Sequence, residues 1–478
     1  QMLSKDPGSK EYWAKQRREL HTLVRENGPF TWFLTLSFNE HRDQFLQQYL
    51  VAKNPDQMQH ILNDTNLLIK SDPICVTKYY EKKVDQFLKE CVRVGDTENE
   101  GYYGPCTDFW LRFEYQGRGT IHTHMVLWIK DAPVWGKDPD EVVIAFVEKY
   151  MTVRMPNPAT EPIMHNLVSN LQVHKCSKQY CMKPRGIFGK FTRNSCRFGF
   201  PHQPTSEWVI NSDEKIVSMR AKRRKRLPKC QPPCTIDEIH INAYNAPTLL
   251  CCQSNMDISP VCGSDTICFY ITKYNTKADE DFTHELFKGL DTTKSLPSRL
   301  HTIAHRVLRD RVAGDAEASQ YIMSIPFVKT SFNIVRMCLG PEETRARCLK
   351  SKAEISKMHD TCENYLRSNW LDTYYPARPE ICENWSFHHM VTNFEVTNEK
   401  PPGARTEYIE FEVVDTVIYK TATNEPRPVT KRLRKFFHRR SNPGILVVSN
   451  EPYSLKDEKF IKQFIFLEIQ KHQPWRQQ

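Results

Sequence analysis

The chain has 478 residues, of which 39% are hydrophobic and 11% aromatic, and its 67 lysine and arginine residues against 57 aspartate and glutamate residues give a net charge of +10. This composition excludes a disordered chain, and the lack of any apolar run of about eighteen residues excludes a membrane-spanning helix. The length predicts about two to four domains. The start is polar and lacks a signal peptide's apolar stretch, and a first residue of glutamine leads us to expect a piece of a longer protein.

The first 155 residues predict an α+β architecture. Apolar residues recur at helical spacing before Gly28-Pro29, and runs rich in aromatic and β-branched residues indicate strands. The turn Gly117-Arg118-Gly119 separates two such runs, as in a β-hairpin. The predicted elements are a helix over 11–27, a strand over 30–38, a helix over 72–94, strands over 108–116 and 120–129, and a helix over 139–155. We expect an antiparallel sheet with helices packed on one face.

The rest of the chain is less regular, and cysteine, glycine and basic residues dominate from 160 to about 235. Helical spacing returns at 264–282, 296–310 and 349–370, strand-like runs occupy 407–419 and 444–449, and 459–469 is either a helix or a strand. The predicted domains are a helical lead-in over 1–29, a main domain over 30–290 with an insertion at about 165–235, a helical region over 291–370 and a mixed region over 371–478.

The stretch "FEYQGRGTIHTHMVLWI" (113–129) places two histidines in an otherwise apolar strand. Strand side chains alternate between faces, so His122 and His124 point the same way and Thr123 points the opposite way. The hairpin brings Glu114 and Gln116 of the preceding strand beside the histidines. Two imidazoles and one of these oxygens would leave open positions on a divalent ion, where phosphate oxygens bind. Glu114 is the favoured third ligand because a carboxylate adds charge, Gln116 is the alternative, and a hydrogen-bonded core pair is the rival interpretation.

The stretch "YITKYNTK" (270–277) spaces Tyr270 from Tyr274, and Lys273 from Lys277, by four residues, so each pair shares one face of a helix. A phenol has a pKa of about 10 and needs a nearby lysine or metal ion to become a nucleophile. Attack by such a tyrosine on phosphorus would conserve the bond energy in a phosphotyrosine link. Two tyrosines would allow two successive transfers. The alternative is an amphipathic helix with ordinary aromatic packing.

A second tyrosine pair, Tyr79 and Tyr80, also precedes lysines by three residues. Adjacent residues on a helix point about 100° apart. These two side chains therefore cannot share one site, and we do not expect them to be nucleophiles.

Sixteen cysteines without a secretory signal predict thiols and metal ligands rather than disulfides. Nitrogen and sulfur ligands of this kind form closed tetrahedral zinc sites that replace a hydrophobic core. The predicted structural zinc ligands are His174, Cys176, Cys181 and Cys196, with His202 as a spare. Cys230 and Cys234 are either further ligands or free thiols, and we favour free thiols.

The stretch 215–229 has eight basic residues and no acidic one, and 431–440 is similar. Such clusters are typical of proteins that bind a phosphate backbone. A solvated loop or a nuclear-import signal is the alternative, and we expect the protein in the nucleus. The predicted DNA-binding residues are Arg118, Arg220, Lys222, Arg223, Arg224, Lys225 and Arg226.

Single-stranded DNA is the expected substrate, because a tyrosine must reach a backbone phosphate that base pairing does not shield. Aromatic side chains can stack on the bases of such a strand. The candidates are Trp110, Trp128, Phe198 and Phe200. For each of them, packing in the core is the alternative.

Taken together, these residues resemble the Rep nuclease of Helitron transposases, members of the HUH endonuclease superfamily. The matching pieces are "FLTLSF", the two-histidine stretch and "YITKYNTK", in that order. Between them, "HKCSKQYC…CRFGFP" is similar to the family's cysteine-rich insertion, and "NAYNAPTLLCCQSNMDI" (242–258) to the segment that leads into its tyrosine helix. The similarity is strongest from about 30 to 280. The segment 442–476 resembles the stretch just before the family's helicase.

The resemblance implies an HUH Rep fold, with the histidine strand central in an antiparallel sheet and the tyrosine helix packed across it. It implies Mg²⁺ or Mn²⁺ at His122, His124 and a third polar ligand. It also implies site-specific nicking of single-stranded DNA at transposon termini, with a 5′-phosphate left on Tyr270 or Tyr274. In the family a helicase follows, so we expect one in the full-length protein and none in this chain.

Two rival functions remain. A replication initiator of a virus or plasmid would use the same chemistry, but the long insertion and the helicase-like lead-in favour the transposon. A non-catalytic, zinc-stabilised DNA-binding module would show salt-dependent binding that is indifferent to His122→Ala and Tyr270→Phe.

Overall fold

In the computed structural model the chain divides into two compact units, Gln1–Ser331 and Phe332–Gln478. The structure describes residues 6–475 except 54, 56–63, 97, 116–120, 178–180, 183–195, 197, 211–229, 262–292, 294, 296, 300–301, 303–313, 342, 344, 401–406 and 449–457.

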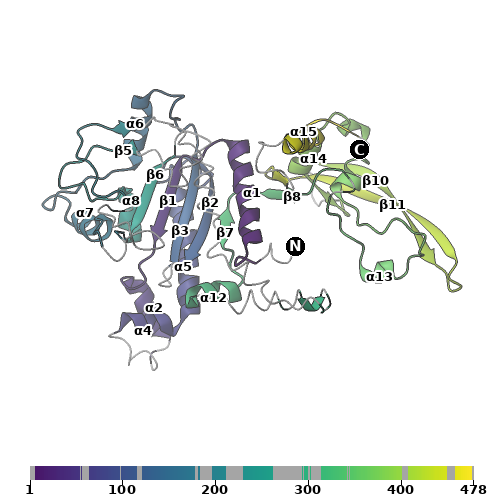
Figure 1. Cartoon of the computed structure of the whole chain (residues 1–478), viewed down its shortest axis with the longest axis horizontal. Coiled ribbons are helices and arrows are strands. Elements are labelled where there is room, and N and C mark those ends of the chain that lie inside the picture. Colours follow the sequence, from purple (N-terminus) through teal and green to yellow (C-terminus); the bar gives the residue numbers. More distant parts are fainter. Residues whose placement is uncertain are drawn as a thin grey trace. The chain divides into compact units, whose positions relative to one another are not determined.

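The first unit is built on a five-stranded antiparallel sheet (Figure 1), as the sequence predicts. Its strand order is β6-β1-β3-β2-β7, so the histidine strand β3 is central. The strands are β1 (Trp32–Ser37), β2 (Cys106–Tyr115), β3 (Ile121–Ile129), β6 (Met256–Pro260) and β7 (Val328–Thr330). The hairpin of β2 and β3 and the strand β1 are therefore confirmed.

Helices flank this sheet, and the predicted helices over 11–27, 72–94 and 139–155 are confirmed. The helices and short strands of the first unit are α1 (Lys10–Asn27), α2 (Gln44–Lys53), α4 (Thr65–Ser71), α5 (Pro73–Phe87), η2 (Leu88–Val92), α6 (Asp140–Tyr150), α7 (Pro162–Leu167), η3 (Val168–Gln172), β4 (Val209–Ile210), β5 (Cys230–Gln231), α8 (Ala246–Cys252) and α12 (Asp315–Ile322). Ser9 caps the start of α1, and Gly28 ends it at φ 78°, which a residue without a Cβ adopts readily.

The two faces of the sheet differ in chemistry. Every second side chain of the central strands is apolar and buried, and these residues form one core with α5 and α6. Lys329 of β7 points to this apolar face and forms ion pairs with Glu81 and Asp85 of α5. The opposite face carries the two histidines and Arg112, whose guanidinium lies over the Trp13 ring of α1. Helices therefore lie on both faces, and the expectation of one covered face is wrong because α1 brings its own apolar stripe.

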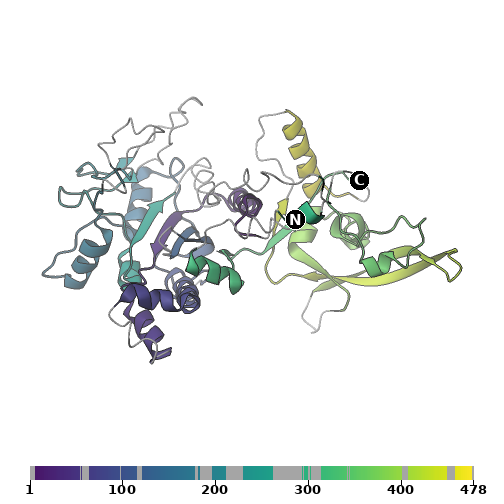
Figure 2. The same ribbon diagram turned by 60° about the horizontal axis from the view of Figure 1, so that its bottom comes forward.

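The second unit has its own core around a three-stranded sheet of order β10-β11-β9. Figures 1 and 2 show β10 and β11 as a long two-stranded ribbon. Its elements are β8 (Ile334–Met337), α13 (Lys352–Ile355), η4 (Trp370–Tyr374), η5 (Glu380–Cys382), α14 (Phe387–Asn393), β9 (Phe394–Thr397), β10 (Tyr408–Lys420), β11 (Pro426–Arg439), β12 (Ile445–Val448) and α15 (Glu458–His472). The strands predicted over 407–419 and 444–449 are confirmed, and the ambiguous 459–469 is helical.

The helix expected over 349–370 is wrong. Only α13 forms there, capped by Ser351 and Glu354. The chain after it runs along β10, where the Lys420 N–H donates to the Lys357 carbonyl and the His359 N–H donates to the Ile418 carbonyl. Pairing with a strand edge thus overrides the helical spacing. Among helices formed by the described residues, none combines the length and the apolarity needed to cross a membrane.

Candidate functional site

The polar face of the sheet carries His122 and His124 side by side on β3, as strand alternation predicts. Thr123 points to the other face and is fully buried. In register, His122 lies opposite Glu114 of β2 and Ser37 of β1. The centres of the two imidazole rings are 6.3 Å apart. We call Glu114, His122 and His124 the strand site.

Glu114 already contacts one of the histidines: its Oε2 lies 2.7 Å from His124 Nε2. Burial opposes ionisation, but the hydrogen bond to His124 and the nearby charges of His124, Arg112 and His122 outweigh it and lower the pKa of Glu114 to about 2. The carboxylate is therefore ionised at neutral pH. Two donors on one octahedral Mg²⁺ ion, each about 2.1 Å from it at a right angle, would lie about 3 Å apart, which is close to this separation.

His122 offers the second imidazole. Burial and the charge of His124 lower the pKa of His122 to about 4, so its ring is neutral at pH 7, the form that binds metals. Its Nδ1 is buried and has no hydrogen-bond partner among the described residues. The three donor atoms of the strand site do not converge within 4.8 Å of one another, so one ion would require a side-chain rotation. The donor chemistry fits Mg²⁺ or Mn²⁺, with positions left for phosphate oxygens.

Sequence reasoning missed two polar neighbours of His124 on the same face. Thr35 of β1 lies opposite His124, and its Oγ1 is 3.1 Å from His124 Nδ1. Asp257 of β6 lies opposite Thr35. Burial raises the pKa of Asp257 to about 6, although the charge of His124 and a hydrogen bond from Asn242 act in the opposite direction. In the sequence, Thr35 and Asp257 each stand out as a polar residue between apolar residues of a strand. A single sequence does not show, however, that these two strands lie beside the histidine strand.

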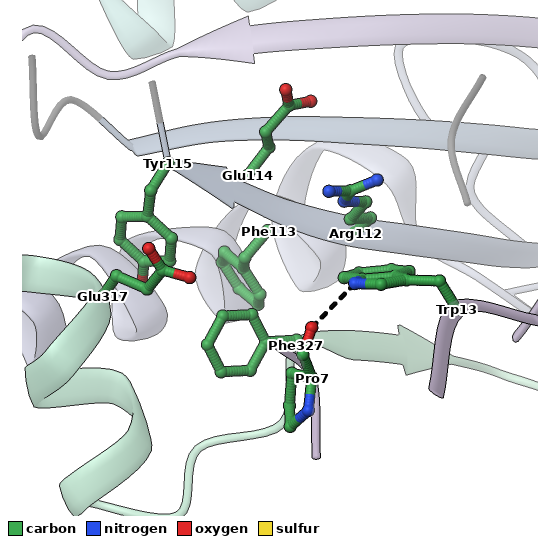
Figure 3. A pocket seen from close by; sticks show the side chains of 8 residues that line it. All are labelled: Pro7, Trp13, Arg112, Phe113, Glu114, Tyr115, Glu317 and Phe327. Carbon is green, nitrogen blue, oxygen red and sulfur yellow. Dashed lines mark hydrogen bonds between the residues drawn. The ribbon is translucent and has the colours of Figure 1, made fainter. Parts of the chain in front are cut away.

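A small pocket borders Glu114 at the end of β2 (Figure 3). Arg112 is buried there, and its guanidinium lies 3.8 Å from the centre of the Trp13 ring. Trp13 itself is fixed by the hydrogen bond from its Nε1 to the Pro7 carbonyl, 2.7 Å long. The first helix thus holds a positive charge close to the strand site.

The predicted nucleophiles lie outside the described residues. They are Tyr270 and Tyr274 with Lys273 and Lys277, and the same holds for Gln116, Arg118 and the basic residues Arg220, Lys222, Arg223, Arg224, Lys225 and Arg226. The other tyrosine pair is described and faces the apolar core. The Tyr79 hydroxyl donates to Asp43, and burial raises the pKa of Tyr79 to about 12. Burial raises the pKa of Tyr80 further, so neither phenol is activated.

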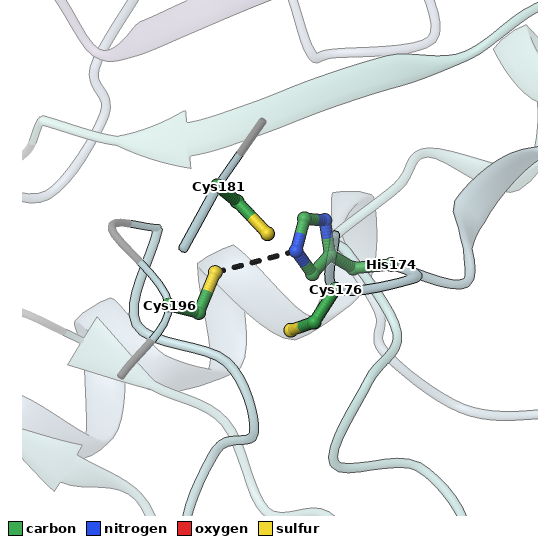
Figure 4. Close-up of side chains that lie close together, drawn as sticks. All are labelled: His174, Cys176, Cys181 and Cys196. Carbon is green, nitrogen blue, oxygen red and sulfur yellow. Dashed lines mark hydrogen bonds between the residues drawn. The ribbon is translucent and has the colours of Figure 1, made fainter. Parts of the chain in front are cut away.

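A second constellation, the cysteine cluster, consists of His174, Cys176, Cys181 and Cys196 (Figure 4). Their ligand atoms all lie within 4.8 Å of one another, and among the described residues this is the one such group of three or more histidine, cysteine or acidic side chains. One nitrogen and three sulfurs at this spacing fit a tetrahedral zinc ion. The cluster could therefore bind zinc, and the four predicted ligands are brought together.

The thiols of the cluster differ in how readily they ionise, and burial raises the pKa of the Cys176 thiol to about 11. Burial opposes ionisation of Cys196, but the backbone N–H groups of Phe198 and Phe200 and two neighbouring thiols lower the pKa of the Cys196 thiol. The Ser177 N–H donates to Cys181 Sγ at 3.1 Å. Beyond Cys181 and Cys196, the small core here contains only Phe200, with Met182 packed against it, among the described residues. A metal ion would supply what this core lacks.

The remaining candidate ligands stand apart from the cluster. His202 packs against the Phe200 ring at 4.5 Å between ring centres and is not among the four converging residues. Cys234 is buried, and its thiol donates to the Gln203 carbonyl at 3.4 Å. Cys234 is likewise not among the four converging residues.

The basic run 431–440 belongs to the ribbon of the second unit, and glutamates neutralise much of its charge. The ion pairs are Arg432–Glu412, Arg434–Glu410, Arg439–Glu407 and Arg440–Glu395. Of the aromatic candidates for base stacking, Trp110, Trp128 and Phe200 are buried in cores, and Phe198 is 45% exposed. Phe198 therefore remains a candidate for base stacking, while the other three side chains pack inside the protein.

Part of the chain is similar to a known family. The family model described as the Helitron helicase-like domain at the N-terminus matches residues 2–127. The matched range contains Thr35, Glu114, His122 and His124 and ends within β3. No curated protein matches the chain.

Proposed function

We propose, on the premise that residues 2–127 carry the Helitron helicase-like domain, that this chain is the nuclease part of a Helitron transposase. It would nick single-stranded DNA at transposon ends and transfer the cut strand. The observation that supports this most is the contact of the ionised Glu114 with His124, beside the neutral imidazole of His122 and inside the matched range.

In this proposal Glu114, His122 and His124 hold Mg²⁺ or Mn²⁺, with Gln116 as the alternative to Glu114. The bound ion would polarise the scissile phosphate. The phenolic oxygen of Tyr270 or Tyr274 forms a bond to phosphorus after Lys273 or Lys277 favours loss of its proton. The bond from phosphorus to the 3′-oxygen breaks, that oxygen takes up a proton, and the 5′-phosphate stays on the tyrosine. Attack by a free 3′-hydroxyl reverses these steps and joins strands without ATP.

We also propose that the cysteine cluster holds a structural zinc ion and that the basic stretch 215–229 contacts DNA. Zinc would order the segment around Cys196, which carries few buried apolar side chains among the described residues. We propose further that the protein acts in the nucleus and that the full-length protein contains a helicase domain.

The test is incubation of the chain with Mn²⁺ and single-stranded DNA from the ends of its own element, followed by a denaturing gel. We expect a covalent adduct that disappears with EDTA and in the double variant Tyr270→Phe/Tyr274→Phe. The matched double variant Tyr79→Phe/Tyr80→Phe should keep it. Mass mapping of the modified peptide then identifies the tyrosine.

An adduct that persists without both Tyr270 and Tyr274 would refute the proposed nucleophiles. DNA binding without an adduct, indifferent to His122→Ala, would instead support the non-catalytic module. Cleavage of plasmid or viral origins rather than element ends would support the replication initiator.

A further inference from the structure

Thr35 lies outside the strand site and forms a hydrogen bond with one of its members, His124. It lies on β1, in register with His124, and its side chain is half-buried on the polar face. Its hydroxyl oxygen is 3.1 Å from His124 Nδ1, while Nε2 of the same ring faces Glu114. The two ring nitrogens therefore have different partners on different strands.

The ring of His124 is also fixed by packing. Phe33, two residues before Thr35, stacks on it with ring centres 5.9 Å apart and an angle of 10° between the planes. A stacked ring can still slide or turn over, and only a directional bond decides which nitrogen points toward Glu114. The hydroxyl of Thr35 makes this distinction at Nδ1.

We propose that Thr35 is a positioning residue of the strand site, which holds His124 so that Nε2 is presented to the metal ion. This inference rests on the proposed function. A histidine that binds a metal through Nε2 carries its proton on Nδ1 and needs an acceptor there. A ring that carries its proton on Nε2 instead donates it to the Glu114 carboxylate and accepts a hydrogen bond at Nδ1. A hydroxyl both donates and accepts, so Thr35 serves either state without moving.

Thr123 provides a matched control on the neighbouring strand. It is fully buried on the opposite face, and its hydroxyl has no hydrogen-bond partner among the described residues. Thr→Val at either position removes one hydroxyl and keeps the shape of the side chain. Only Thr35→Val removes a partner of His124.

The experiment measures Mn²⁺ affinity by calorimetry in the full chain for Thr35→Val, Thr35→Ser and Thr123→Val. We expect Thr35→Val to weaken Mn²⁺ binding by about 10- to 100-fold, the usual effect of losing a partner behind a metal-bound histidine. Thr35→Ser keeps the hydroxyl and should stay within about threefold of the wild type, and Thr123→Val should not differ from it. Wild-type affinity in Thr35→Val overturns the proposal.

A second measurement separates this proposal from the proposed function. In the metal-free chain with ¹⁵N-labelled histidine, Thr35→Val should shift the ring nitrogen resonances of His124, assigned with His124→Asn, and Thr123→Val should leave them in place. If the wild type binds no Mn²⁺ but these resonances shift, the metal site fails and the positioning of His124 by Thr35 stands. If they do not shift, the proposal fails whatever the metal affinity.

Discussion

The strand site and the cysteine cluster are both candidate metal sites, but they relate to the fold in opposite ways. Glu114, His122 and His124 lie on paired central strands, whose backbone ladder fixes their positions without any ion. His174 and Cys196 belong to irregular segments with a core of few side chains. In the first case the fold positions the candidate ligands without an ion, and in the second a bound ion would supply contacts that the few buried side chains do not. Loss of metal from the strand site should therefore remove activity, and loss of metal from the cysteine cluster should remove local structure.

The largest effect should come from His124→Ala. Removal of one of the proposed ligands should cost about 4 kcal/mol of transition-state stabilisation, so nicking falls by about 10³-fold. The β ladder remains, and we expect the melting temperature to fall by about 5 °C or less. Rates of adduct formation and thermal unfolding measure both, with the exposed His41→Ala as the control. Unfolding of His124→Ala would contradict the view that the fold builds the strand site.

Cys181→Ser should have the opposite profile. It replaces a proposed zinc ligand, so zinc affinity should fall by more than about 100-fold, beyond the effect of losing an outer-shell partner. Backbone hydrogen exchange around Cys181 and Cys196 should become fast, while nicking should fall by less than about tenfold. Metal analysis and exchange mass spectrometry measure these effects.

Cys234→Ser is the matched control for that experiment, because Cys234 is also buried, its thiol donates to the Gln203 carbonyl, and it is not one of the four converging residues. It should keep both zinc and protection from exchange. Slow exchange around Cys181 in zinc-free protein would show that the segment folds without the ion. The proposed difference between the strand site and the cysteine cluster would then be wrong.

A smaller change in Mn²⁺ affinity should show whether Glu114 or Gln116 supplies the third ligand of the strand site. Glu114→Gln keeps the shape and an oxygen but removes the charge that lies 2.7 Å from His124. We expect Mn²⁺ affinity to fall by about 10- to 100-fold, within the range found when the surroundings of a metal ligand are altered. Gln116→Ala should change affinity by less than about threefold. The reverse order would make Gln116 the ligand.

The sequence predicts contacts within a strand or a hairpin well, but it does not predict which distant strands pair. Alternation along one strand was enough to place His122 and His124 together, and the hairpin turn was enough to add Glu114. Thr35 and Asp257 were missed because β1 and β6 come beside His124 through long-range pairing. The helix expected over 349–370 failed for the same reason, since the chain after α13 pairs with β10.

The smallest effect tests which tyrosines matter. Tyr79→Phe removes a hydrogen bond to Asp43 and should destabilise the protein by about 1–2 kcal/mol without changing the adduct. Burial raises the pKa of Asp43, but Lys83 and other hydrogen bonds lower it overall. The contribution of this carboxylate is present above about pH 4, the pKa of an unfolded aspartate, and is lost as the pH falls through the lower folded pKa. The deficit of Tyr79→Phe should therefore shrink in acid.

Tyr80→Phe is the counterpart of that variant, because the Tyr80 hydroxyl is buried without a hydrogen-bond partner among the described residues. Its removal should leave stability unchanged or raise it at every pH, since no bond is lost and a buried polar group disappears. Urea unfolding at neutral and acidic pH measures both variants. A lost adduct in either one would move the nucleophile to the apolar face of the sheet, where the core covers it, and would break the assignment of the polar face as the site of chemistry.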